Sequence, residues 1–539
     1  MNTKRKLLML SIVAVLIIAG ASQALAAGRS EPAAAAGPVT MNYHIPGDPT
    51  IIDPSANWIG EVGANFFTPL IGFDANANEI YPRGATSWTV SDDGTVWTFD
   101  IRRDWLWSDG TPLTAADYEY GFQAIVDPET ASPTAFRLSV IENAQAVTNG
   151  SMPVDQLGVR ALDDHTLQIT LEAPASWFLV SLSSIGYALP RWVREEYGTE
   201  WTNPETIVVN GPYTLASRRV DDVYVLEKNP NYYDADNVQI ERINLIVVPQ
   251  QSTAMAMYEN GELDTVMVPI EDLDRVQRDP VLSQEFTSFP RLISQFYWFN
   301  VGRAPFDDVL VRRAFAAAVD KDTLVSRITR GGEVATDTIA PPGVVGYVDP
   351  SLGVGISYDP AQARAWLAEA GYPGGQGFPA VTVGFNFNEF NASVAQALQS
   401  MWQTNLGVEV TLSGVEGGAY GSLTSGGEFN IYRWGWGMAY PDANYIHEGI
   451  FHSKVMSETE RTHRYHSDEF DRLIDEAATA TDQAQREALY LQAERLLVEE
   501  DMGIIPMFFP ADNRVTKPYL NRVQGPLMVQ EFWNWTITQ

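Results

Sequence analysis

Cysteine is absent from this chain of 539 residues. Its absence excludes disulfide bonds, thiolate metal sites, a cysteine nucleophile and a lipid anchor on cysteine. Basic residues are also scarce, because 35 lysines and arginines stand against 68 acidic residues and leave a net charge of -33. Nucleic acids and anionic lipids repel a chain this acidic, so we expect neither as a partner.

Long apolar runs are confined to the start of the chain. Lys4, Arg5 and Lys6 precede an uncharged, mostly apolar run at 7–21, and the small residues of the stretch 24–26 follow it. This order is typical of a secretory signal peptide, and the run is shorter than the roughly 20 residues of a membrane-spanning helix. We predict a cleaved signal peptide at 1–26, a flexible leader at 27–38, and a mature periplasmic protein that is not a lipoprotein.

Catalytic motifs are missing as well. The chain has neither a G-x-S-x-G turn nor a G-x-x-x-x-G-K-[ST] phosphate loop. His447 and His452 resemble the pair of a zinc-protease helix. Their five-residue offset places the imidazoles about 140° apart on a helix, so we expect polar surface histidines. We predict no enzyme activity, no catalytic residues, no metal and no cofactor.

Apolar residues, by contrast, are plentiful. They make up 45% of the chain, enough for large buried cores, and the length implies two or more domains. Alternating patterns predict strands at 96–101 and 166–171, and capping residues predict helices after Thr114, Asp308 and Asp359. Two further amphipathic helices are predicted within 470–499. Four tryptophans are predicted to pack the core of a small lobe: Trp88, Trp97, Trp105 and Trp107. This mixture predicts an α/β fold.

Several sequence blocks occur in the order found in one family. They lie at 88–94, 107–115, 127–133, 210–213, 229–233 and 305–314. Together they resemble the oligopeptide- and dipeptide-type solute-binding proteins of bacterial ABC importers, and 127–133 is most similar to the oligopeptide branch. The similarity extends from about 52 to 528.

The resemblance implies a two-lobed, periplasmic-binding-protein-like α/β fold with a hinge and an additional small domain. Lobe I would comprise 39–69, 206–302 and 496–539, the additional domain 70–205, and lobe II 303–495, with hinge crossings near 301–303 and 495–505. Such a protein closes on an oligopeptide and delivers it to the membrane permease subunits of an ABC importer. We expect it to act as a monomer.

The stretch 429–442 resembles the ligand-facing segment of this family, F-D-x-x-R-x-G-W-x-x-D-Y. In oligopeptide binders the backbone of this segment pairs with an extended peptide, like an added strand. The resemblance assigns a carboxylate-binding role to Arg433 and a pocket role to Trp436. The candidate ligand-binding residues are Asn300, Arg433, Trp434, Gly435, Trp436, Gly437, Met438, Ala439, Tyr440 and Asp442.

The segment departs from the family pattern where the peptide amine would bind. The family aspartate falls at Ala439, and Asp442 is shifted by three residues. Positions that carry further cations in some oligopeptide binders are Asn391 and Thr424 here. An oligosaccharide therefore stays open as an alternative ligand, because the aromatic residues of the segment and of 297–299 could stack on sugar rings. A secreted hydrolase is a remote third alternative.

Overall fold

The computed structural model describes residues 37–49, 52–57, 60–74, 79–524, 527 and 530–538. The chain divides into two units, Met1–Val39 and Thr40–Gln539, and the fold described below is that of the second. The predicted signal peptide and all but the last two residues of the predicted leader lie outside the described residues. Among the described residues, no helix has both the length and the apolar character needed to cross a membrane.

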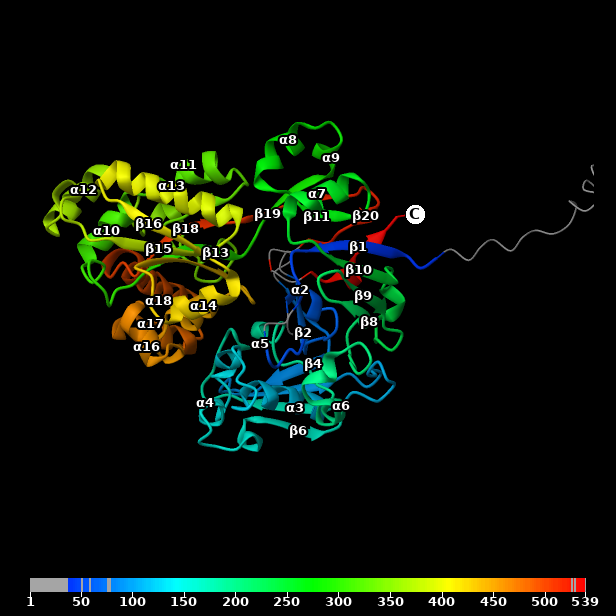
Figure 1. Ribbon diagram of the computed structural model, residues 1–539. Helices are drawn as coiled ribbons and strands as arrows, with labels where there is room; N and C mark the ends of the chain where they lie inside the picture. Colours follow the sequence, from blue (N-terminus) through cyan, green and yellow to red (C-terminus); the bar gives the residue numbers. More distant parts are fainter. Residues whose placement is uncertain are drawn as a thin grey trace, which may run out of the picture. The chain divides into compact units, whose positions relative to one another are not determined.

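Two large mixed sheets organise the unit 40–539 (Figure 1). The first has seven strands in the order β12-β19-β11-β1-β10-β9-β8. Their bounds are β1 Thr40–Ile45, β8 Tyr213–Arg219, β9 Val223–Lys228, β10 Arg242–Val247, β11 Thr265–Met267, β12 Phe286–Pro290 and β19 Ala511–Thr516. The second has six strands in the order β14-β18-β13-β17-β15-β16. Their bounds are β13 Ile293–Phe299, β14 Val334–Ala335, β15 Val381–Asn386, β16 Val410–Val415, β17 Ile431–Gly437 and β18 Ile504–Phe509.

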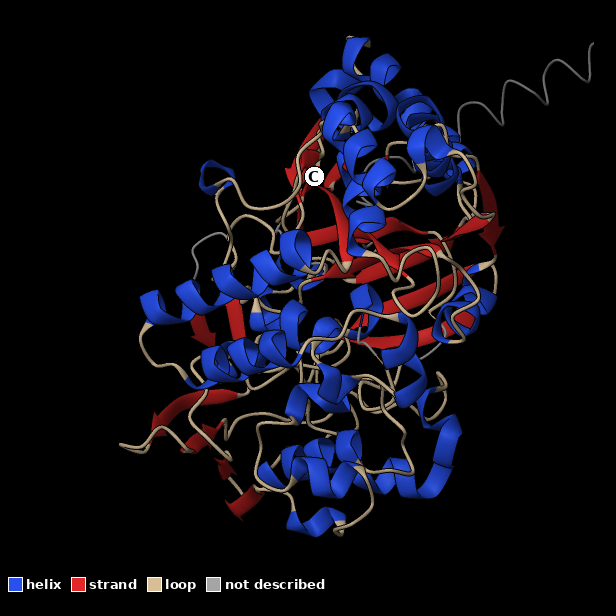
Figure 2. Ribbon diagram, turned by 90° about the vertical axis from the view of Figure 1, so that its left-hand side faces the viewer, coloured by secondary structure: helices blue, strands red, loops and turns tan. Residues whose placement is uncertain are grey.

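Both faces of the second sheet are covered by helices (Figure 2). Successive side chains of a strand point to opposite faces, so Tyr297 and Phe299 of β13 enter one core while Phe296 and Trp298 enter another. The first of these cores contains residues of α10 (Val309–Ala317), α12 (Pro360–Glu369) and α13 (Glu389–Leu406). The second contains residues of α17 (Asp468–Thr479) and α18 (Gln483–Arg495).

A smaller sheet lies within 70–205 and has the strand order β4-β5-β7-β6. Its strands are β4 Ala85–Val90, β5 Val96–Ile101, β6 Val159–Asp163 and β7 Thr166–Thr170, and α3 (Ala115–Val126) contacts β6 and β7. Trp105 and Trp107 are buried in its core, and Trp88 and Trp97 pack partly buried against it. The predicted tryptophan core and the strands at 96–101 and 166–171 are therefore confirmed, the second strand ending one residue earlier.

Local capping sets the starts of the predicted helices. Thr114 and Asp117 form the predicted capping box of α3. Asp308 accepts a hydrogen bond from the backbone N–H of Leu310 at the start of α10, and Asp359 caps α12 with Pro360 as its first residue.

The remaining α-helices and strands of the described residues are short. They are α2 Gly60–Gly63, β2 Ile71–Asp74, β3 Glu79–Pro82, α4 Ala144–Thr148, α5 Phe178–Ser181, α6 Arg191–Tyr197, α7 Gln251–Glu259, α8 Leu273–Arg278, α9 Leu282–Glu285, α11 Lys321–Thr323, α14 Gly417–Ser425, α15 Asn444–Ile446, α16 Glu458–His463, β20 Leu520–Asn521 and β21 Thr536–Ile537.

The chain passes between the two large sheets at two adjacent points (Figure 1). Arg291 and Leu292 connect β12 to β13, and Pro510 connects β18 back to β19. The backbone N–H of Arg291 donates to the carbonyl of Pro510 at 3.0 Å, so the crossings lie side by side. The structure moves both crossings from their predicted places near 301–303 and 495–505, because β13 and β18 pair with each other inside the second sheet. The other predicted lobe boundaries stay predictions.

Phe315 should dominate the stability of the core beside α10. Its ring is fully buried against Phe306, Phe378 and Trp402. We expect Phe315→Ala to lower the free energy of unfolding by about 3–5 kcal/mol in urea titrations, because it removes apolar contacts and leaves a cavity. Phe387→Ala is the matched control: its side chain is 64% exposed, and we expect a change within about 0.5 kcal/mol. Equal losses for the two variants would contradict this assignment of the core.

Candidate ligand-binding site

One edge of β17 is open over most of its length. On one side, β17 pairs with β13 from Ile431 to Gly437. On the other side, β15 pairs only with Ile431 and Tyr432. From Arg433 to Gly437, no described strand pairs with β17 on the β15 side. An open strand edge presents backbone N–H and C=O groups that an extended ligand can pair with.

Tyr420 marks the point where β15 and β17 separate. It lies on α14, and its hydroxyl is 3.1 Å from the carbonyl oxygen of Gly384 and 2.7 Å from that of Arg433. The hydroxyl can donate to either oxygen and so takes the place of the next backbone pairing. Burial raises the pKa of Tyr420, which keeps the hydroxyl protonated as a donor. The side chain thus bridges the two strands at the start of the open edge.

Arg433 is a partly buried cation whose hydrogen-bond partners are neutral. Its guanidinium donates to the side-chain oxygens of Gln295 and, at 2.9 Å, Asn386. No carboxylate of the described residues forms an ion pair with it. Burial lowers the pKa of Arg433, opposed by Tyr297 and Tyr420, but an arginine stays charged in proteins. An uncompensated, desolvated cation favours an anionic ligand group at this position.

Neutral groups surround this cation. The hydroxyl of Tyr297, the cross-strand neighbour of Arg433, is buried and has no hydrogen-bond partner within the described part of the chain. Asn391 donates to both the backbone and the side-chain oxygen of Asn386, at 2.9 and 3.1 Å. Thr424 is buried and bonds to carbonyls of its own helix. Asn391 and Thr424 therefore bring no second cation to the site.

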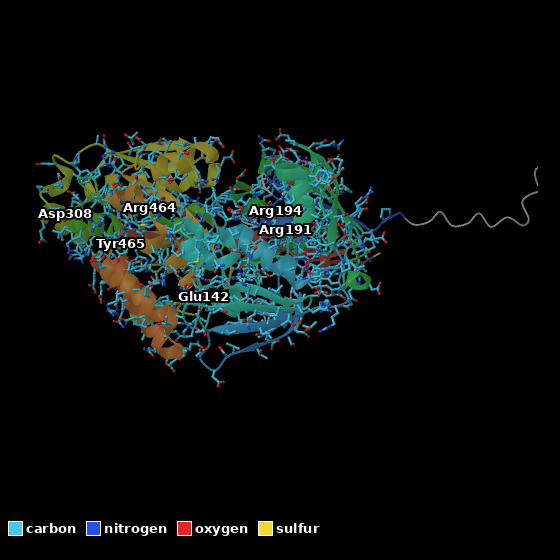
Figure 3. The ribbon with its side chains drawn as sticks, turned by 90° about the horizontal axis from the view of Figure 1, so that it is seen from below. Glu142, Arg191, Arg194, Asp308, Arg464 and Tyr465 are labelled. Atoms are coloured by element: carbon cyan, nitrogen blue, oxygen red, sulfur yellow. The ribbon has the colours of Figure 1, made fainter. Side chains whose placement is uncertain are left out.

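The two tryptophans of β17 face the core that contains α17 and α18. Trp434 packs partly buried there, and the guanidinium of Arg464 lies 5.6 Å from its ring. Figure 3 labels Arg464 and the neighbouring Tyr465. Trp436 lies 5.6 Å from Tyr445. A side chain at Gly435 would meet the amide of Gln295 at 2.8 Å, so this glycine makes room for the residue that holds Arg433.

Two buried residues hold the far end of the segment. Met438 is buried, and its backbone N–H donates to the carbonyl of Leu292 at the first crossing, at 2.8 Å. Tyr440 is buried and donates from its hydroxyl to the side-chain oxygen of Asn444 at 3.1 Å. Ala439, between them, is only partly buried and offers no carboxylate to a ligand amine.

Asp442 is buried, and its carboxylate already has an ion-pair partner and hydrogen-bond donors within the protein. Arg486 forms an ion pair with it at 2.7 Å, and it accepts from the hydroxyl of Tyr490 and the backbone N–H of Asn444, both at 3.0 Å. Burial raises the pKa of Asp442, and the charge of Arg486 opposes this shift. These bonds anchor the end of the ligand-facing segment to α18.

The region 70–205 contacts the residues that follow β17. The rings of Trp177 and Tyr440 stack at 5.9 Å with an interplanar angle of 7°. The guanidinium of Arg137 lies 5.5 Å from the ring of Tyr445, and the hydroxyl of Ser139 donates to Glu448 at 3.3 Å. The region 70–205 thus contacts the chain that follows the second sheet, at the end of the candidate site.

Asn300 and the aromatic residues that precede it are buried in the interior of the protein. The Asn300 amide is buried and donates to the carbonyls of Gly427 and Phe429, at 3.1 and 3.2 Å. Tyr297, Trp298 and Phe299 are each at most 1% exposed. Their rings pack in the two cores and offer no surface on which a sugar could stack.

The prediction that His447 and His452 are surface histidines was wrong. His447 is fully buried and 3.1 Å from Glu494, and His452 is buried and 3.2 Å from Asp475. Both acidic partners come from the helices α17 and α18, which are distant in sequence, so the local pattern did not reveal the burial. The two imidazoles bind different carboxylates.

Comparisons with known proteins identify relatives of this fold and segment. Residues 79–458 match the family model described as bacterial extracellular solute-binding proteins, family 5. The chain is 31% identical over 489 residues to the "Probable deoxycholate-binding periplasmic protein YgiS" of Escherichia coli, covering 89% of this chain and 90% of that protein. It is also 31% identical over 472 residues to the periplasmic oligopeptide-binding protein OppA of Escherichia coli, covering 86% and 85%.

Solved structures of binding proteins are similar to this fold as well. The murein tripeptide binding protein MppA of Escherichia coli has a TM-score of 0.83 at 29% identity, covering 94% of this chain and 99% of that one. Haemophilus influenzae OppA in complex with the peptide RPPGFSPFR has a TM-score of 0.82 at 27% identity, covering 93% and 99%. The predicted resemblance and the two-lobed α/β fold are confirmed.

Removing the charge of Asp442 should cost stability. We expect Asp442→Asn to lower the free energy of unfolding by about 3–5 kcal/mol, because Arg486 would be left buried without a counter-charge. Glu195→Gln is the control, since the Arg191–Glu195 pair at 2.7 Å is exposed and should contribute less than about 1 kcal/mol. A stable Asp442→Asn protein with lowered affinity for free-amine peptides would instead make Asp442 a ligand-binding residue.

Proposed function

Because the chain belongs to family 5 of the bacterial extracellular solute-binding proteins, we propose that it captures oligopeptides between its two lobes and delivers them to an ABC importer. Members of this family bind solutes for transport and are not enzymes. The observation that carries the peptide assignment is the open edge of β17 with Arg433 at its start.

An extended peptide fits this edge by its backbone. Its N–H and C=O groups would pair with the stretch from Arg433 to Gly437, and its carboxylate would meet the guanidinium of Arg433. At about 3.3 Å per residue, the distance along the segment from Arg433 to Ala439 is roughly 20 Å, which suits about four to six extended residues. Backbone pairing of this kind accepts many side chains.

The place of action follows from the same family. We propose a periplasmic protein, released from a cleaved signal peptide at 1–26 and free of a lipid anchor, since the chain contains no cysteine. The relatives from Escherichia coli carry the word periplasmic in their names. We further propose that it acts as a monomer and docks on membrane permease subunits.

A second candidate ligand is an apolar carboxylate that is not a peptide. Arg433 can bind any carboxylate, and Ala439 provides no charge for an amine. A relative named for deoxycholate, which is such a molecule, covers 89% of this chain. Adding deoxycholate to the calorimetry described below distinguishes this ligand from a peptide. The aromatic rings at 297–299 do not support the oligosaccharide alternative, because they are buried and cannot stack on a sugar.

Arg433→Ala tests the carboxylate site. We expect the variant to bind free-carboxylate peptides about ten- to hundredfold more weakly by calorimetry, because a charge-assisted hydrogen bond contributes about 1.5–3 kcal/mol. The amides of the same peptides should lose less than about threefold, since an amide carries no charge to pair with the guanidinium. Arg219→Ala, at an arginine whose side chain is 69% exposed, controls for loss of charge alone. Equal losses for acids and amides would make Arg433 a structural residue.

Ala439→Asp tests the end of the proposed site where the amino group of a peptide would lie. The wild-type protein should bind N-acetylated peptides at least as well as free-amine peptides, because a buried ammonium without a counter-charge is costly. The variant should favour free-amine over acetylated peptides by about tenfold or more, and Ala439→Asn, which adds the same volume without the charge, should not. A strong preference of the wild-type protein for the free amine would show that another carboxylate binds it.

A further inference from the structure

The guanidinium of Arg433 lies between side chains of the two strands that flank β17. It donates to the amide oxygen of Gln295 on β13 and, at 2.9 Å, to that of Asn386 at the end of β15. β15 pairs with β17 through Val383 and Gly384, so Asn386 lies beyond the point where this pairing ends. The guanidinium therefore reaches the β15 side of β17, which is the side of the open edge.

Both amides are held in place by their surroundings. Gln295 lies opposite Gly435 in the pairing of β13 with β17, and a side chain at that glycine would meet the Gln295 amide at 2.8 Å. Asn386 accepts a second hydrogen bond, from the amide of Asn391 on α13, at 3.1 Å. Because an arginine can only donate, it is the oxygen of each amide that faces Arg433.

These surroundings supply oxygens but no negative charge. An amide oxygen accepts a hydrogen bond while its group stays neutral. Burial raises the pKa of Tyr297, opposed by Arg433, and burial also raises the pKa of Tyr420, so both hydroxyls stay protonated. Among the described residues, no carboxylate forms an ion pair with Arg433. The cation is therefore held in place while its charge stays uncompensated.

A carboxylate at either amide position would change this site. Glutamate has the length of glutamine and aspartate that of asparagine, so the bonds to Arg433 would persist with a negative charge added. The resulting ion pair would compensate the cation, and the new carboxylate would repel the carboxylate of a ligand. The amide at each of these positions therefore decides whether the site attracts an anion.

We propose that Gln295 and Asn386 are positioning residues that determine the specificity of the Arg433 site for a ligand carboxylate. They hold the guanidinium beside the open edge by hydrogen bonds and, being neutral, leave its charge available to the ligand. The proposal rests on the proposed peptide function and names the residues that set the preference for a free carboxylate.

The test compares N-acetylated tetra-alanine with a free carboxylate and the same peptide as its carboxamide, by calorimetry. The wild-type protein should bind the acid at least about tenfold more tightly than the amide, because only the acid carries a charge for Arg433. Gln295→Glu and Asn386→Asp should each bring the two affinities within about twofold, mainly by weakening the acid. Gln295→Met has neither acceptor nor charge and should keep at least about a fivefold preference for the acid, since the cation stays uncompensated.

Gln362→Glu is the matched control, because Gln362 is exposed on α12 and the change adds the same charge. It should keep the wild-type preference. If Gln295→Glu and Asn386→Asp keep the preference, or if Gln295→Met abolishes it as fully as Gln295→Glu, the assigned roles are overturned while the peptide function stands. If one acidic variant does not fold, the other decides.

Two results with the wild-type protein alone bear on the proposal as well. Equal binding of the acid and the amide would overturn the specificity role of Gln295 and Asn386 and leave the peptide function standing. Binding of neither peptide would overturn the proposed peptide function together with this inference.

Discussion

A single backbone hydrogen bond, from Arg291 to Pro510, joins the two segments through which the chain passes between its large sheets. Each segment is one or two residues long and leads directly into β13 or out of β18, which pair with each other. Rotation of one sheet against the other can therefore occur by changing a few backbone angles, as in hinge closure. Because β13 also carries β17, the position of the ligand-facing segment depends on this junction.

The two edges of β17 differ in their backbone pairing. One edge pairs with β13 along the whole strand, while the other edge pairs with no described strand from Arg433 onward. The hydroxyl of Tyr420 bridges β15 and β17 at the point where their pairing ends. In the proposed peptide complex, recognition by the backbone is indifferent to side chains, so selectivity has to come from the two ends of the candidate segment. One end carries the guanidinium of Arg433, and the other carries the uncharged Ala439.

The distribution of charge around the site is unusual for so acidic a chain. With 68 acidic residues in the sequence, the described part of the chain leaves Arg433 paired only with neutral oxygens. Asp442, the nearby acid of the segment, is bound by Arg486 and Tyr490 instead. A buried pair of this kind costs much to break, which fixes Asp442 as an anchor of the segment. Neither Ala439 nor Asp442 therefore offers an unpaired carboxylate at this end of the candidate segment.

The sequence by itself determined the features that depend on neighbouring residues. The caps at Thr114, Asp308 and Asp359 join groups two or three residues apart, and the order of the sequence blocks sufficed to identify the family. Only the tertiary structure decided the burial of His447, the pairing of Asp442 with Arg486 and the place of the two crossings. Each of these depends on contacts between residues far apart along the chain, and no local pattern encodes which distant strand or helix will supply the partner.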